Sequence, residues 1–405
     1  MPEADWGGAE KVMIGVAVNR QGSALSGYRV LDLTDEKGML CSRYLADMGA
    51  EVIRIEKPGG GLARSPFFWA ANLGKLGITL NIEVEPGQEI FKRLVESADV
   101  LVESQPLGYL EALGLGYSQF GQINPRLVMA SITDFGQSGP YRDYKSCDIV
   151  ANALGGQMYV CGKPHSPPLK PFGNQSYYLA SIFAAIGVLL TLWKRHTSGR
   201  GQHIDISLQE CAAATLDHVL VRYFYQGIVA KRQGSLHWNN AFRIFPCRDG
   251  YILLSLLQQW ETLVEWLDSE AMAEDLIDEK WLDRGERLKH LDHIIEVLER
   301  WTKTHTVVEL VEKGQLMHFP WAEVTSIPKL VGSPQLRERD FFIEVEHPQS
   351  GKRYKFPRAP CKLSRSPWQV GGKVPKIGEH NMKIYHGELG LSKAEIETLV
   401  KEGVI

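Results

Sequence analysis

The chain has 405 residues, 44% of them hydrophobic, and its 45 Lys and Arg residues nearly balance its 48 Asp and Glu residues. This length allows a large core and predicts two or three domains. The ordinary composition excludes a disordered, collagen-like or coiled-coil protein. With a net charge of -3 and no run of Lys or Arg, there is little electrostatic basis for binding nucleic acid or a membrane surface. Small molecules and protein partners remain as the expected ligands.

The cysteines and the chain start predict a cytoplasmic protein. The six cysteines show neither C-x-x-C nor metal-ligand spacing, which predicts free thiols in a reducing compartment. The stretch 1–18 begins acidic and has no basic leader, so a signal peptide is not expected. The longest apolar stretch, Leu179–Trp193, is shorter than the roughly 18 residues of a membrane span and predicts a buried helix.

Between Tyr28 and about Gln209, short apolar runs alternate with segments of helical periodicity. Such alternation predicts an α/β fold, with a parallel sheet and helices on its faces. Ligands of such folds usually bind at the carboxyl ends of the strands. The predicted strands are Tyr28–Thr34, Glu51–Glu56, Asp99–Glu103, Leu127–Ile132 and His203–Ile206, and the predicted helices include Gly38–Met48, Pro86–Glu96 and Tyr177–Trp193.

The rest of the chain has a different pattern. Residues 245–334 are mainly of helical periodicity, with one clear strand at Tyr251–Leu254. Two further apolar runs, 341–347 and 352–356, flank a turn sequence at 348–351 and predict a hairpin. Ser392 and Glu395 have the spacing of a capping box and predict the start of a last helix.

Local motifs do not by themselves identify a chemistry. A nicotinamide site is disfavoured, because no G-x-G-x-x-G lies between Thr34 and the helix although a strand ends at Glu56. His290 and His293 lie one helical turn apart without a recognisable third ligand, so a surface pair is favoured and no metal site is predicted. Ser198–Gln202 has the glycines and charge to hold an anion, but a tight helix-to-strand connection is the favoured interpretation.

A larger pattern covers nearly the whole chain. Six blocks occur in order at 25–34, 45–59, 123–127, 131–141, 197–202 and 378–381. Together they resemble the family III CoA-transferases, the family of formyl-CoA transferase, carnitine CoA-transferase and the α-methylacyl-CoA racemases. The resemblance implies a Rossmann-like large domain formed by residues 1–220 and 336–405 and a smaller domain inserted at 221–335. It also implies two ring-like subunits interlinked as a dimer.

The resemblance implies that the family's nucleophile is missing from this sequence. Family enzymes move CoA between acids through an Asp carboxylate, which attacks the donor thioester and passes through a mixed anhydride and an aspartyl thioester. That Asp follows a Gly just before the long apolar helix, and here the pair is Gly173-Asn174. A neutral amide does not serve as both nucleophile and leaving group. The resemblance therefore implies that Asn174 occupies the nucleophile position and that this chain has no catalytic residue of its own; racemisation, which uses the same Asp, is disfavoured too.

Other positions that hold CoA in the family are also changed. The family's Arg before the Leu-Gly-Leu motif is replaced by Ala112, its small turn by Glu36–Met39, and its mobile glycine loop by Gly234–Trp238. We expect bulky side chains to fill space at these positions. Lys57 and Lys75 are retained, and the resemblance makes them candidate phosphate contacts of CoA, with solvated surface lysines as the alternative.

The resemblance thus implies that this chain is the non-catalytic subunit of a heteromeric family III CoA-transferase. It also implies a paralogous partner subunit that carries the Asp, and a complex that is expected to move CoA from succinyl-CoA to an aromatic dicarboxylate such as (R)-benzylsuccinate. CoA thioesters are expected as substrates, with no tightly bound cofactor. The alternative is a catalytically active homodimeric acyl-CoA transferase or racemase that uses a non-standard residue.

Overall fold

The computed structural model describes residues 22–347 and 351–405. The expectation of no signal peptide and most of the predicted turn at 348–351 lie outside this part of the chain. The chain divides into two compact units. Within the described residues, the larger comprises 22–155, 172–215, 338–347 and 351–405, and the smaller comprises Gly156–Pro171 and Leu216–Arg337. The predicted domain boundaries and the interlinked dimer stay predictions.

The larger unit is built on a six-stranded sheet in the order β3-β2-β1-β4-β5-β6. All neighbouring strands are parallel, and this is the strand order of Rossmann folds, which reverses direction between β1 and β4. The predicted α/β fold with a parallel sheet is therefore confirmed. The strands are β1 (Arg29–Leu33), β2 (Glu51–Glu56), β3 (Leu76–Thr79), β4 (Val100–Glu103), β5 (Val128–Thr133) and β6 (His203–Ser207).

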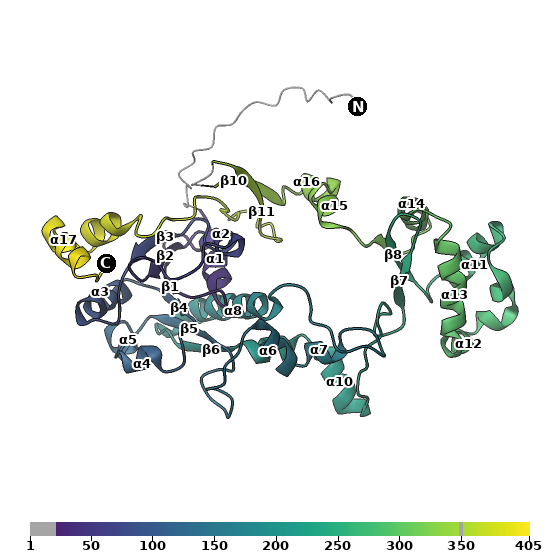
Figure 1. Cartoon of the computed structure of the whole chain (residues 1–405), viewed down its shortest axis with the longest axis horizontal. Helices are drawn as coiled ribbons and strands as arrows, with labels where there is room; N and C mark the ends of the chain where they lie inside the picture. Colours follow the sequence, from purple (N-terminus) through teal and green to yellow (C-terminus); the bar gives the residue numbers. More distant parts are fainter. Residues whose placement is uncertain (1–21, 348–350) are drawn as a thin grey trace, which may run out of the picture. The chain divides into compact units, whose positions relative to one another are not determined.

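Helices cover both faces of this sheet (Figure 1). Alternate residues of β4 show the division: Val100 and Val102 face one core, and Leu101 faces the other. The first core includes α1 (Met39–Asp47), α6 (Asp148–Leu154), α8 (Gln175–Ser198) and α9 (Leu208–Ala214). The second includes α3 (Glu85–Glu96), α4 (Tyr109–Ala112), α5 (Tyr117–Ile123), the π-helix η3 (Met382–Glu388) and α17 (Lys393–Lys401).

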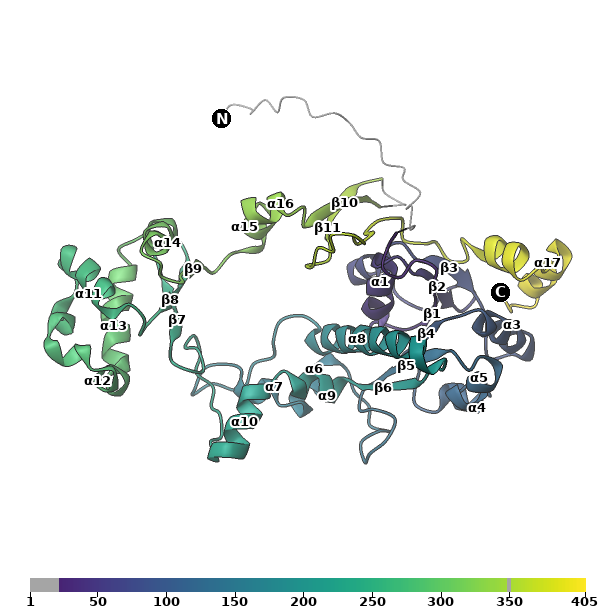
Figure 2. The same ribbon diagram turned by 180° about the vertical axis from the view of Figure 1, so that it is seen from behind.

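Helix α8 extends beyond the predicted bounds at both ends. Its first turn is held by Asp148, whose Oδ1 accepts hydrogen bonds from the Ser176 backbone N–H and hydroxyl at 2.9 and 2.8 Å, and it ends where Gly199 adopts φ +69°. Among the described residues it is the helix whose length and apolar composition match a membrane span, with 44% of that window buried. Ala184 and Val188 pack in the core, and Figure 2 shows the helix lying along the sheet.

The C-terminal segment completes the edge of the sheet. The backbone N–H groups of Gly77 and Thr79 in β3 donate to the side chains of His380 and Asn381, each at 3.0 Å. A Cβ on Gly77 would lie 2.8 Å from the Pro375 side chain, so only glycine allows this approach. The unit also contains α2 (Pro66–Ala71) and the antiparallel hairpin β10 (Phe342–Glu346) and β11 (Arg353–Pro357), which confirms the predicted hairpin strands.

The smaller unit has an aromatic core beside an antiparallel sheet, in the order β7-β8-β9. Trp266, Trp301, Trp321 and Phe319 pack together there. The sequence predicted β8 and missed the other two strands. The elements are α7 (Gln157–Val160), α10 (Asp217–Gln226), β7 (Phe242–Pro246), β8 (Tyr251–Ser255), α11 (Trp260–Ser269), η1 (Glu274–Ile277), η2 (Glu279–Leu282), α12 (Arg284–Lys289), α13 (Leu291–Thr302), α14 (Val307–Leu316), β9 (Ala322–Glu323), α15 (Ile327–Val331) and α16 (Pro334–Glu338), which reaches the boundary.

Candidate functional site

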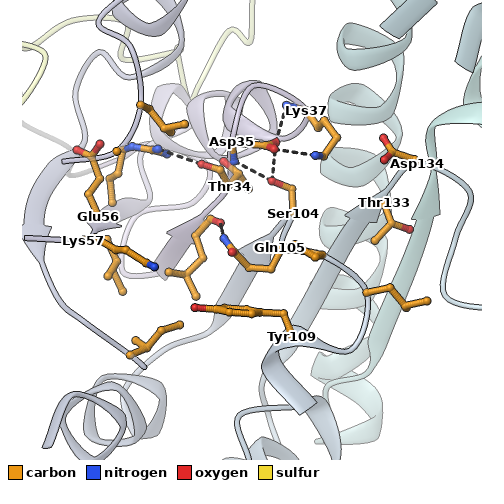
Figure 3. A pocket seen from close by; sticks show the side chains of 18 of the residues that line it. Thr34, Asp35, Lys37, Glu56, Lys57, Ser104, Gln105, Tyr109, Thr133 and Asp134 are labelled. Carbon is orange, nitrogen blue, oxygen red and sulfur yellow. Dashed lines mark hydrogen bonds and ion pairs between the residues drawn. The ribbon is translucent and has the colours of Figure 1, made fainter. Parts of the chain in front are cut away.

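A cavity of about 530 Å³ opens at the carboxyl ends of the parallel strands in the larger unit. Residues that follow β1, β2, β4 and β5 line it, and Figure 3 shows their side chains. The cavity lies where the strand order reverses. The loops that follow the strands on either side of that point run in opposite directions, which leaves a space between them. The sequence had predicted this edge of the sheet as the place for a ligand.

The loops after β1 and β4 are joined by a small polar cluster. The Ser104 hydroxyl donates to the Asp35 carboxylate at 2.7 Å and accepts from the Asp35 backbone N–H at 2.7 Å. Lys37 Nζ lies 2.7 Å from the other oxygen of Asp35. Figure 3 shows these three side chains linked at the cavity wall. Because Lys37 pairs with Asp35, its positive charge is already balanced when no ligand is bound.

Another side of the cavity carries Gln105, Tyr109 and Lys57 (Figure 3). Lys57 Nζ forms an ion pair with Glu83 at 2.7 Å, and the Tyr109 hydroxyl donates to the same carboxylate oxygen at 3.0 Å. These hydrogen bonds hold the pKa of Glu83 below its usual range. The Lys57 side chain is 56% exposed, so its pairing is weak and an anionic ligand can compete for it.

Arg54 connects the cavity to a buried charge network. Its guanidinium lines the cavity, donates to the Thr34 carbonyl at 2.9 Å and lies 3.3 Å from Asp32. Asp32 also pairs with Lys75 at 2.8 Å. Burial alone would raise the pKa of Asp32, but Lys75 and Arg54 hold it well below its usual value. Burial lowers the pKa of Lys75 to about 8, although Asp32 opposes that shift.

The structure separates the two lysines that the resemblance had paired. Lys57 lines the cavity. Lys75 has no exposed side-chain surface, and its amino group contacts Asp32, the Met39 carbonyl, Ser42 and Asn72 within 3.0 Å. Lys75 is not among the cavity-lining residues, so its contacts in this structure are those of a buried structural charge.

Asn174 lies at the N-terminus of α8, as the sequence pattern placed it. It is the N-cap residue, and its side chain makes no capping hydrogen bond. Gly173 before it adopts φ +79°, a conformation that favours glycine. Asn174 is not among the residues lining the cavity. The structure thus places Asn174, Lys57 and Lys75 at three distinct locations in the larger unit.

Asp134 is a cavity residue that the sequence reasoning did not select. It follows β5 directly, and its Oδ1 is buried with no hydrogen-bond partner among the described residues. Burial raises its pKa, Asp35 adds to that effect, and Lys37 and Lys145 oppose it. It also contributes to the raised pKa of Tyr177, about 12, in the first turn of α8. Its place at a strand end and its place within the block 131–141 were the sequence signals for it.

The positions where the chain departs from the family pattern differ in exposure and in packing. Ala112 ends α4 and is exposed. In the turn before α1, a Cβ on Gly38 would lie 2.7 Å from Thr34 Cγ2, so the chain is tightly packed there. In the smaller unit, the Trp238 ring stacks on His218 at 4.5 Å between ring centroids. Trp238 is 43% exposed, so the expectation that bulky side chains fill space at these positions stays a prediction.

The two histidines set aside as a surface pair lie in the smaller unit. His293 Nε2 contacts Asp275 at 2.6 Å, and His290 lies 3.6 Å from Glu286. In residues 22–347 and 351–405, no three His, Cys, Asp or Glu side chains are grouped as a metal site requires. The connection at Ser198–Gln202 is the tight link between α8 and β6 that the sequence favoured.

Comparison with known proteins agrees with the fold and the motifs. A family profile described as CoA-transferase family III matches residues 25–381. The chain is 31% identical to the succinyl-CoA:(R)-benzylsuccinate CoA-transferase subunit BbsE of Thauera aromatica, over 95% of this chain and 98% of that one. It is also 31% identical to the formyl-CoA:oxalate CoA-transferase of Streptomyces avermitilis, over 94% and 99% of the two chains.

A solved structure shows the same architecture. A CaiB/BaiF family protein from Brucella suis superposes with a TM-score of 0.82 at 27% identity, covering 91% of this chain and 100% of that one. The chain therefore belongs to CoA-transferase family III. The resemblance given by the six sequence blocks is confirmed.

Proposed function

We propose that this chain is a subunit of a heteromeric family III CoA-transferase and that it does not carry the nucleophile. The observation that carries the proposal is Asn174, an amide at the N-terminus of α8 behind the positive-φ Gly173. The family reaction needs a group that attacks a thioester and later leaves as a carboxylate. An amide has no full negative charge for the attack, and its acyl adduct does not decompose like an anhydride.

The outer face of α8 supports a protein partner. Ile182, Ile186, Leu190 and Trp193 recur at helical spacing and are exposed, the last two at 59% and 74%. Within the described part of the chain nothing covers this apolar stripe, and such surfaces mark protein interfaces. We propose that a paralogous subunit with Gly-Asp at the position of Gly173-Asn174 binds there, in the interlinked dimer that the resemblance implies.

The similarity to subunit BbsE suggests the substrates of such a complex. We propose transfer of CoA from succinyl-CoA to an aromatic dicarboxylate such as (R)-benzylsuccinate. Within this chain, Lys57 is the retained lysine that can reach a phosphate, because it lines the cavity and its pair with Glu83 is exposed. A phosphate contact by Lys75 would require loss of its buried network, so the proposal keeps Lys57 alone.

The test compares the isolated chain with the complex. The chain alone is given succinyl-CoA and the dicarboxylate, and both thioester exchange and intact mass are measured; neither turnover nor a covalent adduct is expected. Co-expression with a paralogue carrying Gly-Asp should yield a stable complex with activity, which is lost when that Asp is changed to Asn. Turnover by the isolated chain would contradict the proposal.

Asp134 favours a second candidate, a catalytically active homodimeric acyl-CoA transferase. It is a carboxylate at the cavity with one oxygen lacking a hydrogen-bond partner among the described residues. In this case the isolated chain is active, and Asp134→Asn abolishes both turnover and the acyl adduct. Asp143→Asn, at an exposed cavity residue paired with Arg142, is the matched control and retains activity.

A further inference from the structure

Three neighbouring strands place polar side chains on one buried face of the sheet. Glu103 ends β4 and pairs with Ser131 of β5. His203 begins β6 and pairs with Met129, which lies two residues before Ser131 on β5. Residues two apart on a strand share a face, and Met129 packs in the core on the α5 side. Glu103, Ser131 and His203 therefore form a row across that face.

The row brings a hydroxyl group beside the buried acid. Ser131 is the cross-strand neighbour of Glu103 on the same face, and its hydroxyl helps to lower the pKa of that carboxyl group. Ser131 Oγ lies 2.8 Å from His203 Nε2. Glu103 and Ser131 are only 4% and 1% exposed, whereas His203 is half-buried and stacks on Tyr117 of α5 at 5.4 Å between ring centroids. The row of three side chains thus leads from a buried acid to an imidazole ring near solvent.

Glu103 also fixes a wall of the cavity. Its Oε2 accepts a hydrogen bond from the Gln105 backbone N–H at 2.7 Å, and the Gln105 side chain donates to the Leu33 carbonyl at 2.7 Å. Gln105 lines the cavity, where Figure 3 shows it beside Tyr109. The position of Gln105 therefore depends on the carboxyl group behind it.

We infer that Glu103 is a positioning residue of the cavity and that Ser131 and His203 form the relay through which it exchanges its proton with solvent. This inference goes beyond the proposed function. It requires neither CoA binding nor a particular role for Asn174.

Each protonation state of the relay is fully hydrogen-bonded. With Glu103 protonated, its O–H donates to Ser131 Oγ and the Ser131 O–H donates to His203 Nε2. On ionisation, the Glu103 proton moves to Ser131 Oγ, the Ser131 proton moves to Nε2, and His203 releases its Nδ1 proton to water. The Glu103 carboxylate then accepts from Ser131, and Nε2–H donates to Ser131. One proton leaves, and His203 is neutral in both states with opposite tautomers.

The surrounding charges place this change near neutral pH. Burial raises the pKa of Glu103 to about 7, against the hydrogen bonds from Ser131 and Gln105, and Glu111 and Asp35 raise it further. Burial lowers the pKa of His203, and Asp205 and Glu111 oppose that shift. These are the charged groups that face the relay from β6, α4 and the loop after β1. The lowered pKa favours the neutral form of His203 in the range where Glu103 titrates.

The test follows the relay and the cavity wall in the full chain without ligand. In ¹⁵N-histidine NMR, His203 should change from the Nδ1–H to the Nε2–H tautomer between pH 6 and 8. Over the same range, hydrogen exchange corrected for intrinsic rates should show roughly five-fold greater protection at Gln105, since bonds to a charged acceptor are stronger by about 1 kcal/mol. Glu103→Gln should abolish both transitions, and Glu111→Gln, at an exposed neighbour, should retain them.

A second variant tests the relay if Glu103→Gln fails to fold. Ser131→Ala leaves Glu103 in place but breaks the chain, so the Gln105 transition should persist while the His203 tautomer no longer changes with it. The inference would be overturned if the His203 tautomer of the native chain stayed constant from pH 6 to 8, or if the His203 tautomer still changed in Ser131→Ala as it does in the native chain. Neither readout uses a CoA thioester, so these outcomes are separate from failure of the proposed transferase function.

Discussion

The two units bury their polar groups in different ways. In the larger unit, Asp32, Lys75 and Arg54 form a charged network with at most 1% of each side chain exposed. In the smaller unit the core is aromatic, and its carboxylate Glu270 sits at the edge, 25% exposed. Glu270 accepts hydrogen bonds from the indole N–H groups of Trp266 and Trp301 at 2.8 and 2.7 Å.

This difference separates a unit with buried charges beside a cavity from one whose core is mainly aromatic. Buried ion pairs contribute little net stability because desolvation costs offset their attraction, although removing one partner is severe. Their presence beside the cavity fits a role in holding its wall, since Arg54 touches both the network and the cavity. Aromatic contacts, by contrast, stabilise mainly through buried area.

Loss of one buried charge should produce the largest effect. Lys75→Met leaves the Asp32 carboxylate with a weaker set of partners in the interior and should lower the free energy of unfolding by about 3–5 kcal/mol. Lys57→Met removes an exposed ion pair and should cost less than about 1 kcal/mol. Urea unfolding followed by circular dichroism measures both. Equal losses in the two variants would contradict the contrast between buried and exposed charge.

A cavity in the aromatic core should cost nearly as much in the smaller unit. Trp301 is 0% exposed, and Trp301→Ala should lower the free energy of unfolding by about 3–5 kcal/mol through lost contacts and the space left behind. Glu270→Gln keeps an oxygen acceptor for only one of the two indole N–H groups and should cost about 2 kcal/mol, because the other N–H loses its acceptor. Near-ultraviolet circular dichroism during thermal unfolding reports on this cluster. A larger loss for Glu270→Gln would mean that charge, not packing, stabilises this unit.

The buried acid at the cavity should make stability depend on pH. The pKa of Glu103 is about 7 in the folded chain against an ordinary 4.5, so the unfolded chain loses this proton first as the pH rises. The resulting contribution lowers the free energy of unfolding between pH 4.5 and 7, by at most about 3 kcal/mol, and is constant above pH 7. Glu103→Gln should remove that contribution. The free energy of unfolding of the variant is subtracted from that of the native chain at each pH, and this difference isolates the contribution of Glu103.

A native-minus-variant difference that is flat or rises over this interval would contradict the raised pKa. Glu111→Gln serves as the control, because its exposed carboxylate should leave the fall in place.

Sequence patterns located the strands of the larger unit but not all of its edge. β2 was predicted at its observed bounds, Glu51–Glu56, because its apolar run is long and its flanks are clear. β3 was missed, since it has four residues including Gly77 and is held by side chains some 300 positions later, such as His380. A short strand stabilised by such distant contacts carries little local signal.

The same limit applies to the candidate site. The carboxyl edge of the sheet was predicted from the alternation of strands and helices, whereas Lys57, which lines the cavity there, was selected by the family resemblance. The row of Glu103, Ser131 and His203 depends on the register of three strands, which the separate segments do not specify. Lys75 was selected by motif alone, and its burial follows from contacts with α1 and Asp32 that the motif does not encode.

The smallest expected effect tests whether helix capping stabilises the two units equally. Each contains a capping box: Ser392 with Glu395 begins α17 of the larger unit, and Thr306 with Glu309 begins α14 of the smaller one. Ser392→Ala and Thr306→Ala should each cost about 1 kcal/mol, because each leaves one helix N–H without its acceptor. Urea unfolding of both variants gives the comparison. If the two losses differ by more than about 1 kcal/mol, the units differ in how strongly a helix end is coupled to its core, and the contrast between them extends beyond buried charge.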